Sequence, residues 1–257
     1  MNILKKEILG ILYSTKGKIV LSIILILPQI DAMLSYQIIS KGAGGVHPSM
    51  AAFLSGYSGH IVQMLLMWLL PLYGLLMYGE QAVLEKKNGY EPIIMVRENK
   101  KKIYLSKIAA GFVSMFSAIM ITLILNYVIC LVLFFGGNRF KGLENYVATM
   151  DGWMLFSMRN PIIAYIVHII VTSMIAGFVG ALCVALSTII SNLKMLYGVC
   201  FIIWFAQIIQ NYSITYAMQP FIEYDLDYII PALLILLGVT MGCILVGYIK
   251  KVKVDNI

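Results

Sequence analysis

Side chains that could act as nucleophiles, general bases or metal ligands are few in this chain and lie far apart. The three histidines, His47, His60 and His168, are dispersed and form no H-E-x-x-H pair that could hold a zinc ion. Ser58 lies in the sequence Gly-Tyr-Ser-Gly, which has the form of a serine nucleophile turn, but we interpret this glycine-rich stretch as a flexible loop. The four cysteines lie inside apolar runs without C-x-x-C spacing and are interpreted as small buried side chains. These patterns predict no catalytic residue and no metal site.

Nucleotide and calcium chemistry also lack their motifs. Gly17-Lys18 is not preceded by the glycine of a P-loop, so this chain cannot cradle nucleotide phosphates in that way. Glu223, Asp225 and Asp227 alternate in one acidic stretch, but the spacing and the glycine of an EF-hand are absent. We therefore expect this chain to be a non-enzyme that binds no cofactor, and any ATP that drives it to be hydrolysed by another polypeptide.

The composition places the chain in a membrane. It is 61% hydrophobic and only 12% charged, which is too little charge to cover the surface of a soluble domain. Apolar runs of about 18 residues or more predict membrane-spanning helices. We predict an all-α fold with one transmembrane domain over 1–257. Its six spans are expected at about 19–39, 61–79, 108–135, 161–190, 195–211 and 228–249.

The distribution of Lys and Arg predicts the orientation of these spans. Four basic residues precede the first span, seven lie between the second and third, one lies between the fourth and fifth, and three follow the last, whereas the opposite side has four. Basic residues collect on the cytoplasmic side, so both termini are expected in the cytoplasm of a bacterial cell with the spans in its plasma membrane. Because the positive charge lies near span ends, we do not interpret it as nucleic-acid binding.

The stretch 2–16 has the pattern of an amphipathic helix. Leu4, Ile8 and Ile11 fall on one stripe, and Lys5 and Lys6 lie off it. Such a segment can lie in the lipid headgroup layer, which makes membrane lipid an expected partner. The alternative is an ordinary basic flank.

Polar residues inside predicted spans are candidates for a transport pathway. Asp31 is an intramembrane carboxylate, which is costly and is a functional candidate unless it reaches water at the outer interface. The polar residues of the fifth span, which lie at helical spacing, are Trp204, Gln207, Gln210 and Asn211. They could line a pathway or bond helices together, and we favour helix bonding.

Two pairs of small residues at a spacing of four predict close helix packing. They are Ser173 with Gly177 in the fourth span and Gly238 with Gly242 in the sixth.

One charged segment, 80–107, separates the second and third spans. It contains seven of the 19 Lys and Arg residues and four of the 12 acidic ones. Asn88-Gly89 predicts a turn, and Pro92 suits the first position of a helix. The apolar stretch 93–96 would face the cytoplasm inside a basic rim, and such exposed apolar groups usually bury against a partner.

In this order of residues the chain resembles the permease subunits of ABC-2 type transporters. Their pattern places acidic residues, then glycine, then an apolar stretch, then a basic residue that opens the third span; here these are Glu80, Glu85, Gly89, 93–96 and Lys107. The resemblance implies the fold of a type V exporter, with an N-terminal elbow helix and six spans. The polar segment between the fifth and sixth spans is shorter than that family would lead us to expect.

The resemblance also implies partners and contact residues. A separate ABC ATPase, which carries ATP and Mg²⁺, would dock on a coupling helix, and a second permease copy or a paralogue would complete the pathway. The residues implied to contact the ATPase are Glu85, Tyr90, Glu91, Pro92, Ile93, Ile94, Met95, Val96, Arg97, Asn192 and Lys194.

The function implied is export of an amphipathic or peptide-like substrate, for example an antimicrobial peptide, in peptide export or immunity. Two other functions stay open. An ion-coupled carrier or channel would need several intramembrane ionisable groups in a relay, and only Asp31 and His168 are available. A membrane immunity protein without transport activity would need no ATPase partner.

Overall fold

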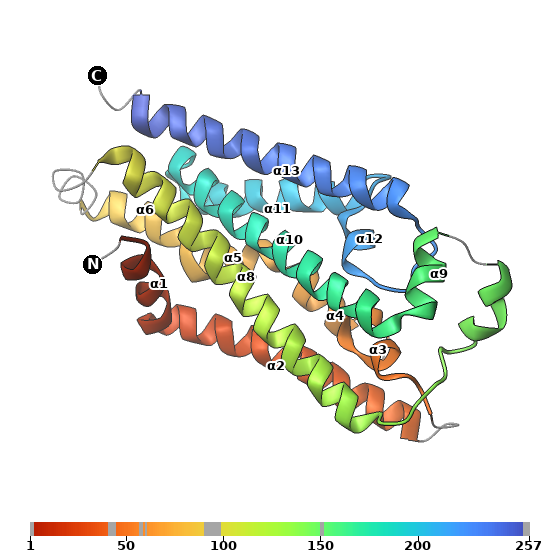
Figure 1. Cartoon of the computed structure of the whole chain (residues 1–257). Helices are drawn as coiled ribbons and strands as arrows, with labels where there is room; N and C mark the ends of the chain where they lie inside the picture. The colour runs from red at the N-terminus through yellow and green to blue at the C-terminus, as the bar shows by residue number, and fades with distance from the viewer. Residues whose placement is uncertain are drawn as a thin grey trace.

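The computed structural model describes residues 3–40, 45–56, 59, 61–89, 99–149 and 152–253, and these residues form helices joined by turns. The predicted all-α fold is confirmed for this part of the chain, in which the only β-type pairing is an isolated bridge between Val46 and Arg139. The longer helices lie side by side in an elongated bundle (Figure 1). Four of these helices are long and apolar enough to cross a membrane, as a membrane protein requires.

The four candidate spans are α2 (Thr15–Ser40), α8 (Lys100–Leu133), α10 (Pro161–Ile189) and α13 (Leu226–Tyr248). The region predicted as the second span is bent by 44° after its first helix, α4 (Ile61–Met67). The part after the bend consists of α5 (Leu70–Gly74), η2 (Leu75–Gly79) and α6 (Glu80–Lys87). The region predicted as the fifth span is α11 (Leu193–Ile209). At 1.5 Å per residue its 17 residues are about 26 Å long, less than the hydrocarbon thickness of about 30 Å. Six complete spans therefore stay a prediction.

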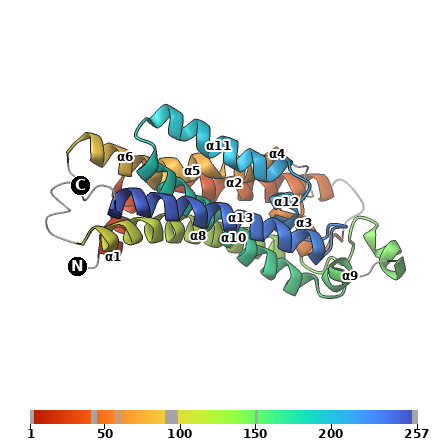
Figure 2. The same cartoon turned by 90° about the horizontal axis from the view of Figure 1, so that it is seen from above.

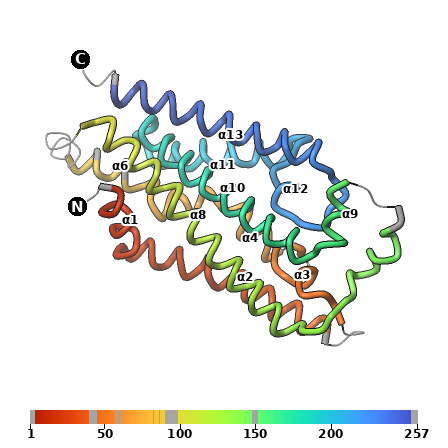
Figure 3. Tube along the Cα trace, in the orientation of Figure 1, coloured from red at the N-terminus to blue at the C-terminus, as the bar shows by residue number. Residues whose placement is uncertain are grey.

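Shorter helices lie at the two ends of the bundle. They are α1 (Ile3–Tyr13), α3 (Pro48–Ala51), η1 (Phe53–Ser55), η3 (Leu143–Thr149), α9 (Gly152–Arg159), α12 (Ile214–Met218) and η4 (Ile249–Lys253). Figure 2 shows α1 and α6 at one end and α9 at the other. We call the end with α1, α6 and η4 the basic end, because it contains Lys16, Lys107, Lys194 and Lys250. The trace in Figure 3 runs along α2 away from this end, back through α4 to α6, and away again along α8.

Helix α10 is the centre of the bundle. In an 18-residue apolar stretch of α10, 78% of the residues are buried, against 22% to 39% in the corresponding stretches of the other three candidate spans. It packs most extensively on α8, and the two helices approach closely where Gly111 faces Gly180. A Cβ on Gly180 would collide with the backbone oxygen of Gly111, so only glycine permits this crossing.

Two prolines interrupt helical hydrogen bonding, and side chains from other helices replace the missing donors. Pro28 has no N–H to give to the carbonyl of Ile24 four residues earlier, and the hydroxyl of Thr122 donates to that oxygen instead at 3.0 Å. Pro71 likewise has no N–H for the carbonyl of Met67, and the indole of Trp204 donates to it at 3.2 Å.

A separate helix precedes the first candidate span, in the region predicted to be an elbow. The chain breaks at Ser14, whose hydroxyl accepts the N–H of Gly17 at 2.9 Å and so caps α2. A Cβ on Gly17 would collide with the carbonyl oxygen of Ile11, so glycine is needed for α1 to fold back at this angle. The position of α1 in the headgroup layer stays a prediction.

Candidate functional site

The segment predicted to contact an ATPase begins and ends at the basic end of the bundle. Its central residues, Tyr90, Glu91, Pro92, Ile93, Ile94, Met95, Val96 and Arg97, lie outside the described residues. The structure does describe the two helices that flank these central residues, α6 before them and α8 after them. The hydrogen bonds and ion pairs of these two helices show how the segment is connected to the rest of the bundle.

Glu85 joins the two helices that flank the segment. Its carboxylate accepts a hydrogen bond from the ammonium group of Lys107 on α8, and both side chains are largely buried. The amide of Gln81, one turn earlier on α6, donates to the other carboxylate oxygen at 3.1 Å. A partly buried pair is screened less than a surface pair, so this contact holds α6 against α8 more firmly than an exposed ion pair would.

Glu80 connects α6 to two further helices. One carboxylate oxygen lies 2.6 Å from the ammonium group of Lys16 at the start of α2, and the other accepts the hydroxyl of Tyr197 on α11 at 2.6 Å. Hydrogen bonds to charged groups contribute about 1.5–3 kcal/mol each. The lysine contact adds little, because the Lys16 side chain is 63% exposed. The bond to Tyr197 is therefore the stronger connection, and it links α6 to the helix that begins at the second predicted contact.

The amphipathic helix α1 is attached to the same region. Glu7 is only 8% exposed, and its carboxylate accepts the hydroxyl of Tyr78 at 2.8 Å. Tyr78 lies in η2, a π-helical turn between α5 and α6. Single π-turns inside helices are often found at functional sites. Here the π-turn immediately precedes α6, so the bond from Tyr78 to Glu7 connects α1 to the start of that helix.

The second predicted contact, Asn192 with Lys194, lies in the turn between α10 and α11. The Asn192 side chain accepts the N–H of Lys194 at 3.0 Å and caps α11, while the ammonium group of Lys194 is exposed. Lys250 donates to the carbonyl of Ile189 at 2.7 Å, which fastens the end of α10 to η4. The turn is thus held on both sides, and Tyr197, one turn into α11, connects it to Glu80.

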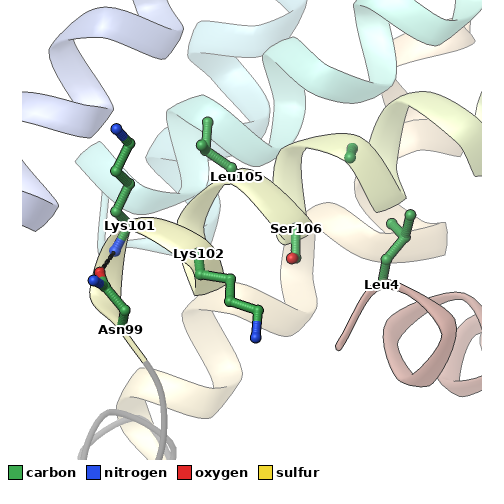
Figure 4. A pocket seen from close by; sticks show the side chains of 7 residues that line it. Leu4, Asn99, Lys101, Lys102, Leu105 and Ser106 are labelled. Carbon is green, nitrogen blue, oxygen red and sulfur yellow. Dashed lines mark hydrogen bonds between the residues drawn. The ribbon is translucent and has the colours of Figure 1, made fainter. Parts of the chain in front are cut away.

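An open groove lies between α1 and the first turns of α8, beside this network (Figure 4). Its volume is about 570 Å³. The residues that line it are Leu4, Asn99, Lys101, Lys102, Leu105, Ser106 and Ala109. Asn99 caps α8 by accepting the N–H of Lys101 at 2.9 Å. The groove therefore combines apolar walls with two ammonium groups and one hydroxyl.

Among curated proteins, the chain is similar to a protein of Bacillus subtilis (strain 168) described as "Uncharacterized protein YybM". The two are 35% identical over 216 residues, which is 84% of this chain and 84% of the other. The chain belongs to the YybM family. No protein-family model matches the chain, and no solved structure matches it significantly. The relationship establishes family membership and assigns no activity.

In this YybM-family chain, Asp31 lies inside the bundle. It is completely buried, and it is close enough to Cys130 of α8 and Tyr165 of α10 to interact with them electrostatically. Burial among these helices argues against the alternative that Asp31 reaches water at the outer interface. It leaves open whether the carboxylate serves a pathway or the packing of the helices.

The polar residues predicted on the fifth span have different surroundings. Trp204 is buried and bonds Met67, and Gln207 is buried and accepts the amide of Gln210 at 3.3 Å, whereas Asn211 is exposed. The bond from Trp204 agrees with the preferred interpretation as helix bonding. A separate cavity of about 260 Å³ lies nearby and is lined by Gln63, Met64, Met67, Trp68, Ile208, Thr215 and Gln219.

The two predicted packing pairs behave differently. A Cβ on Gly177 would meet the ring of Phe112 at 2.8 Å, and the hydroxyl of Ser173 lies 3.8 Å from the sulfur of Met120, so this pair packs on α8. Cβ atoms on Gly238 and Gly242 would meet no described atom within 4 Å. Within the described part of this chain, the second pair makes no close helix contact.

Several connecting residues lie outside the sequence-based prediction. Tyr197 and Lys16 hold Glu80, and Thr122 and Asn126 bond carbonyls of α2, with Asn126 donating to Pro28 at 2.6 Å. A signal for Thr122 was available in principle, because a proline inside a span leaves a carbonyl four residues earlier that needs a donor. No local signal identifies which helix supplies that donor.

Proposed function

We propose that this chain is the permease subunit of an ATP-driven exporter of the ABC-2 type, and that a separate ABC ATPase docks on the segment between α6 and α8. The observation that carries the proposal is the set of contacts that connect the helices on both sides of this segment to the rest of the bundle. Glu85 holds the two flanking helices together, and Glu80 connects α6 to α2 and α11. A force applied to the segment would therefore reach several helices of the bundle at once.

The route of such a force follows the strongest contacts. Movement of α6 would act through Glu80 on Tyr197 of α11, and through Lys107 on α8, which packs along α10. Rigid helices with discrete hydrogen-bonded contacts can shift together between two arrangements. In the proposed cycle, closure of the ATPase pair moves these helices and opens a path for an amphipathic or peptide-like substrate.

The proposed orientation places the basic end in the cytoplasm of a bacterial cell. It follows from the excess of Lys and Arg at the span ends on that side. In this arrangement both termini are cytoplasmic, and α6 and α8 present the segment to a cytoplasmic ATPase. A second permease, identical or a paralogue, would complete the pathway, since a single bundle has α10 rather than a channel at its centre.

Ile94→Asp tests the docking role directly. The neighbouring reading frames are first searched for a P-loop ATPase, the chain is co-expressed with the candidate found there, and co-purification, ATP-dependent export and membrane insertion are measured. We expect Ile94→Asp to insert normally while losing both ATPase capture and export, because a carboxylate cannot be buried in an apolar docking groove. The matched control is Leu84→Asp, which places the same charge on an exposed position of α6.

Two outcomes would contradict the proposal. One is that Ile94→Asp still captures the ATPase and exports as the unmodified chain does. The other is that Leu84→Asp abolishes capture to the same degree, which would mean that added negative charge, rather than the apolar contact, is responsible.

The buried carboxylate of Asp31 favours a second candidate, an ion-coupled carrier or channel. A fully buried acid inside a membrane bundle is a frequent element of proton or cation pathways. Export that continues after complete ATP depletion, follows the proton gradient and is lost in Asp31→Asn would favour this candidate. Export that stops on ATP depletion would favour the ABC permease.

A further inference from the structure

The groove between α1 and α8 has an amphiphilic lining. Leu4, Leu105 and Ala109 supply apolar surface, and Lys101, Lys102 and Ser106 supply two positive charges and a hydroxyl. In Figure 4, Lys102 and Ser106 leave α8 on one side and Lys101 and Leu105 on the other, so the ammonium groups flank the first turns of the helix. Its volume of about 570 Å³ is within the range of about 300–1,000 Å³ of small-molecule sites.

The described residues that line the groove include two lysines and no carboxylate. On neighbouring elements, Glu7 of α1 accepts the hydroxyl of Tyr78, and Glu85 of α6 accepts the ammonium of Lys107, so both acids have other partners. The groove would thus attract an anion.

We propose that this groove binds an anionic phospholipid, with its phosphate at Lys102 and Ser106, on the side of α8 that faces Leu4, and with the beginning of its acyl chains against Leu4 and Ala109. Lys101 adds positive charge from the other side of the same helical turn. Charge complementarity selects an anionic headgroup, and lysines beside a span end attract such lipids by about 1 kcal/mol each. The apolar wall favours a lipid over free phosphate, which has no apolar part to bury. A lipid in this position would bridge α1 and α8 at the base of the charged segment.

The site does not depend on the ATPase proposal. It requires only that the chain lies in a membrane with the groove at the headgroup level, where the start of a membrane-spanning helix such as α8 belongs. Loss of ATPase docking would therefore leave the lipid site intact, and loss of lipid binding would leave the docking proposal untouched.

Native mass spectrometry of the purified full chain tests the site. The probes are phosphatidylglycerol and phosphatidylcholine at equal concentration, with inorganic phosphate as a competitor. We expect retention of phosphatidylglycerol over phosphatidylcholine, and about 25-fold weaker retention in the double variant K101Q/K102Q, or about fivefold per charge. The matched control, K18Q/K87Q, removes two exposed lysines from the same end and should leave retention unchanged.

A second variant keeps the charge and fills the groove. Ser106→Trp should reduce retention of phosphatidylglycerol while Lys101 and Lys102 remain, and Ala109→Phe replaces it if Ser106→Trp does not fold, as judged by circular dichroism. Equal retention of the two lipids, equal losses in K101Q/K102Q and the control, or displacement of the lipid by inorganic phosphate would each overturn the proposal. So would groove variants that keep the lipid and lose ATPase capture, because the groove would then be a protein-docking surface.

Discussion

The hydrogen bond from Thr122 to the carbonyl of Ile24 leads to a prediction whose size depends on Pro28. Thr122 and Ile24 are completely buried, and the oxygen of Ile24 lacks its helical donor because residue 28 is proline. Thr122→Val replaces the hydroxyl by a methyl group of similar size and leaves this carbonyl with no donor. We expect the free energy of unfolding to fall.

The magnitude follows from the membrane setting. Leaving a buried acceptor unsatisfied costs about 1–3 kcal/mol in soluble proteins, and interhelical hydrogen bonds in membranes average about 0.6 kcal/mol with a maximum near 1.7. We therefore expect Thr122→Val to cost about 1 kcal/mol. In the background of Pro28→Ala, residue 28 regains an N–H for the carbonyl of Ile24, and the same substitution should cost close to nothing. The coupling between the two sites is then about 1 kcal/mol.

The assay is equilibrium unfolding of the purified chain in mixed micelles, with all four members of the cycle. Thr240→Val is the matched control, because Thr240 is buried and its hydroxyl has no hydrogen-bond partner among the described residues. It should be neutral or stabilising. If Thr122→Val costs the same in the unmodified chain and in the Pro28→Ala background, the reasoning is refuted. An equal cost of Thr240→Val would assign the loss to packing.

Three further predictions rest on other contacts. Trp204→Phe removes the donor to the carbonyl of Met67 and should lower the free energy of unfolding by about 1 kcal/mol in the same micelle assay, whereas an unchanged value would mean that the bond does not matter. Gly180→Ala should lower the free energy of unfolding by about 1–3 kcal/mol, because the added Cβ would collide with the backbone of α8. Gly238→Ala should leave this free energy unchanged, because no described atom lies within 4 Å of the added Cβ. Equal effects of the two substitutions would contradict the assigned crossing of α8 and α10. Hydrogen bonds from backbone N–H groups, first from its own and then from Phe140 and Gly142, lower the pKa of Glu144 below 4.5. These bonds therefore hold the loop in place above pH 4.5 and are lost as the pH falls through the lowered pKa. Amide exchange in this loop should become faster in acid, and Glu144→Gln should remove that pH dependence.

The class of the protein followed from composition, but the completeness of its spans did not. Long apolar runs require burial in lipid or protein, so α2, α8, α10 and α13 were predictable in position. The bend between α4 and α5 was not predicted, although Pro71 at the start of α5 is a local reason for it. Whether α11 crosses completely depends on tilt and on local membrane thickness, which no residue pattern encodes.

The candidate site was predictable in its charges and not in its connections. The order of acidic residues, glycine, apolar stretch and basic residue over 80–107 predicted a cytoplasmic contact, and the resemblance to ABC-2 permeases singled out Glu80, Glu85 and Lys107. That Glu80 pairs with Lys16, 64 residues earlier, and Tyr197, 117 residues later, depends on how three helices pack. The pattern of a single segment contains no information on such partners.

The two classes of glycine in the bundle show why a motif within one helix does not predict a contact between two. Gly238 and Gly242 have the spacing of a helix-packing motif, yet their faces are open, while Gly111 and Gly180 form the tightest part of the α8–α10 crossing without sharing a motif. Close approach requires one small residue on each of two helices at the same depth, so the decisive pattern is distributed over distant parts of the sequence. The Gly238–Gly242 pair lies on α13, the least buried of the four candidate spans, and no described residue packs closely against it. The pair can therefore still pack against another molecule. Since lipid alone does not require glycine at either position, a second copy or a paralogue is the neighbour that would explain the spacing, and Gly238→Leu should weaken self-association in cross-linking without lowering the stability of the monomer.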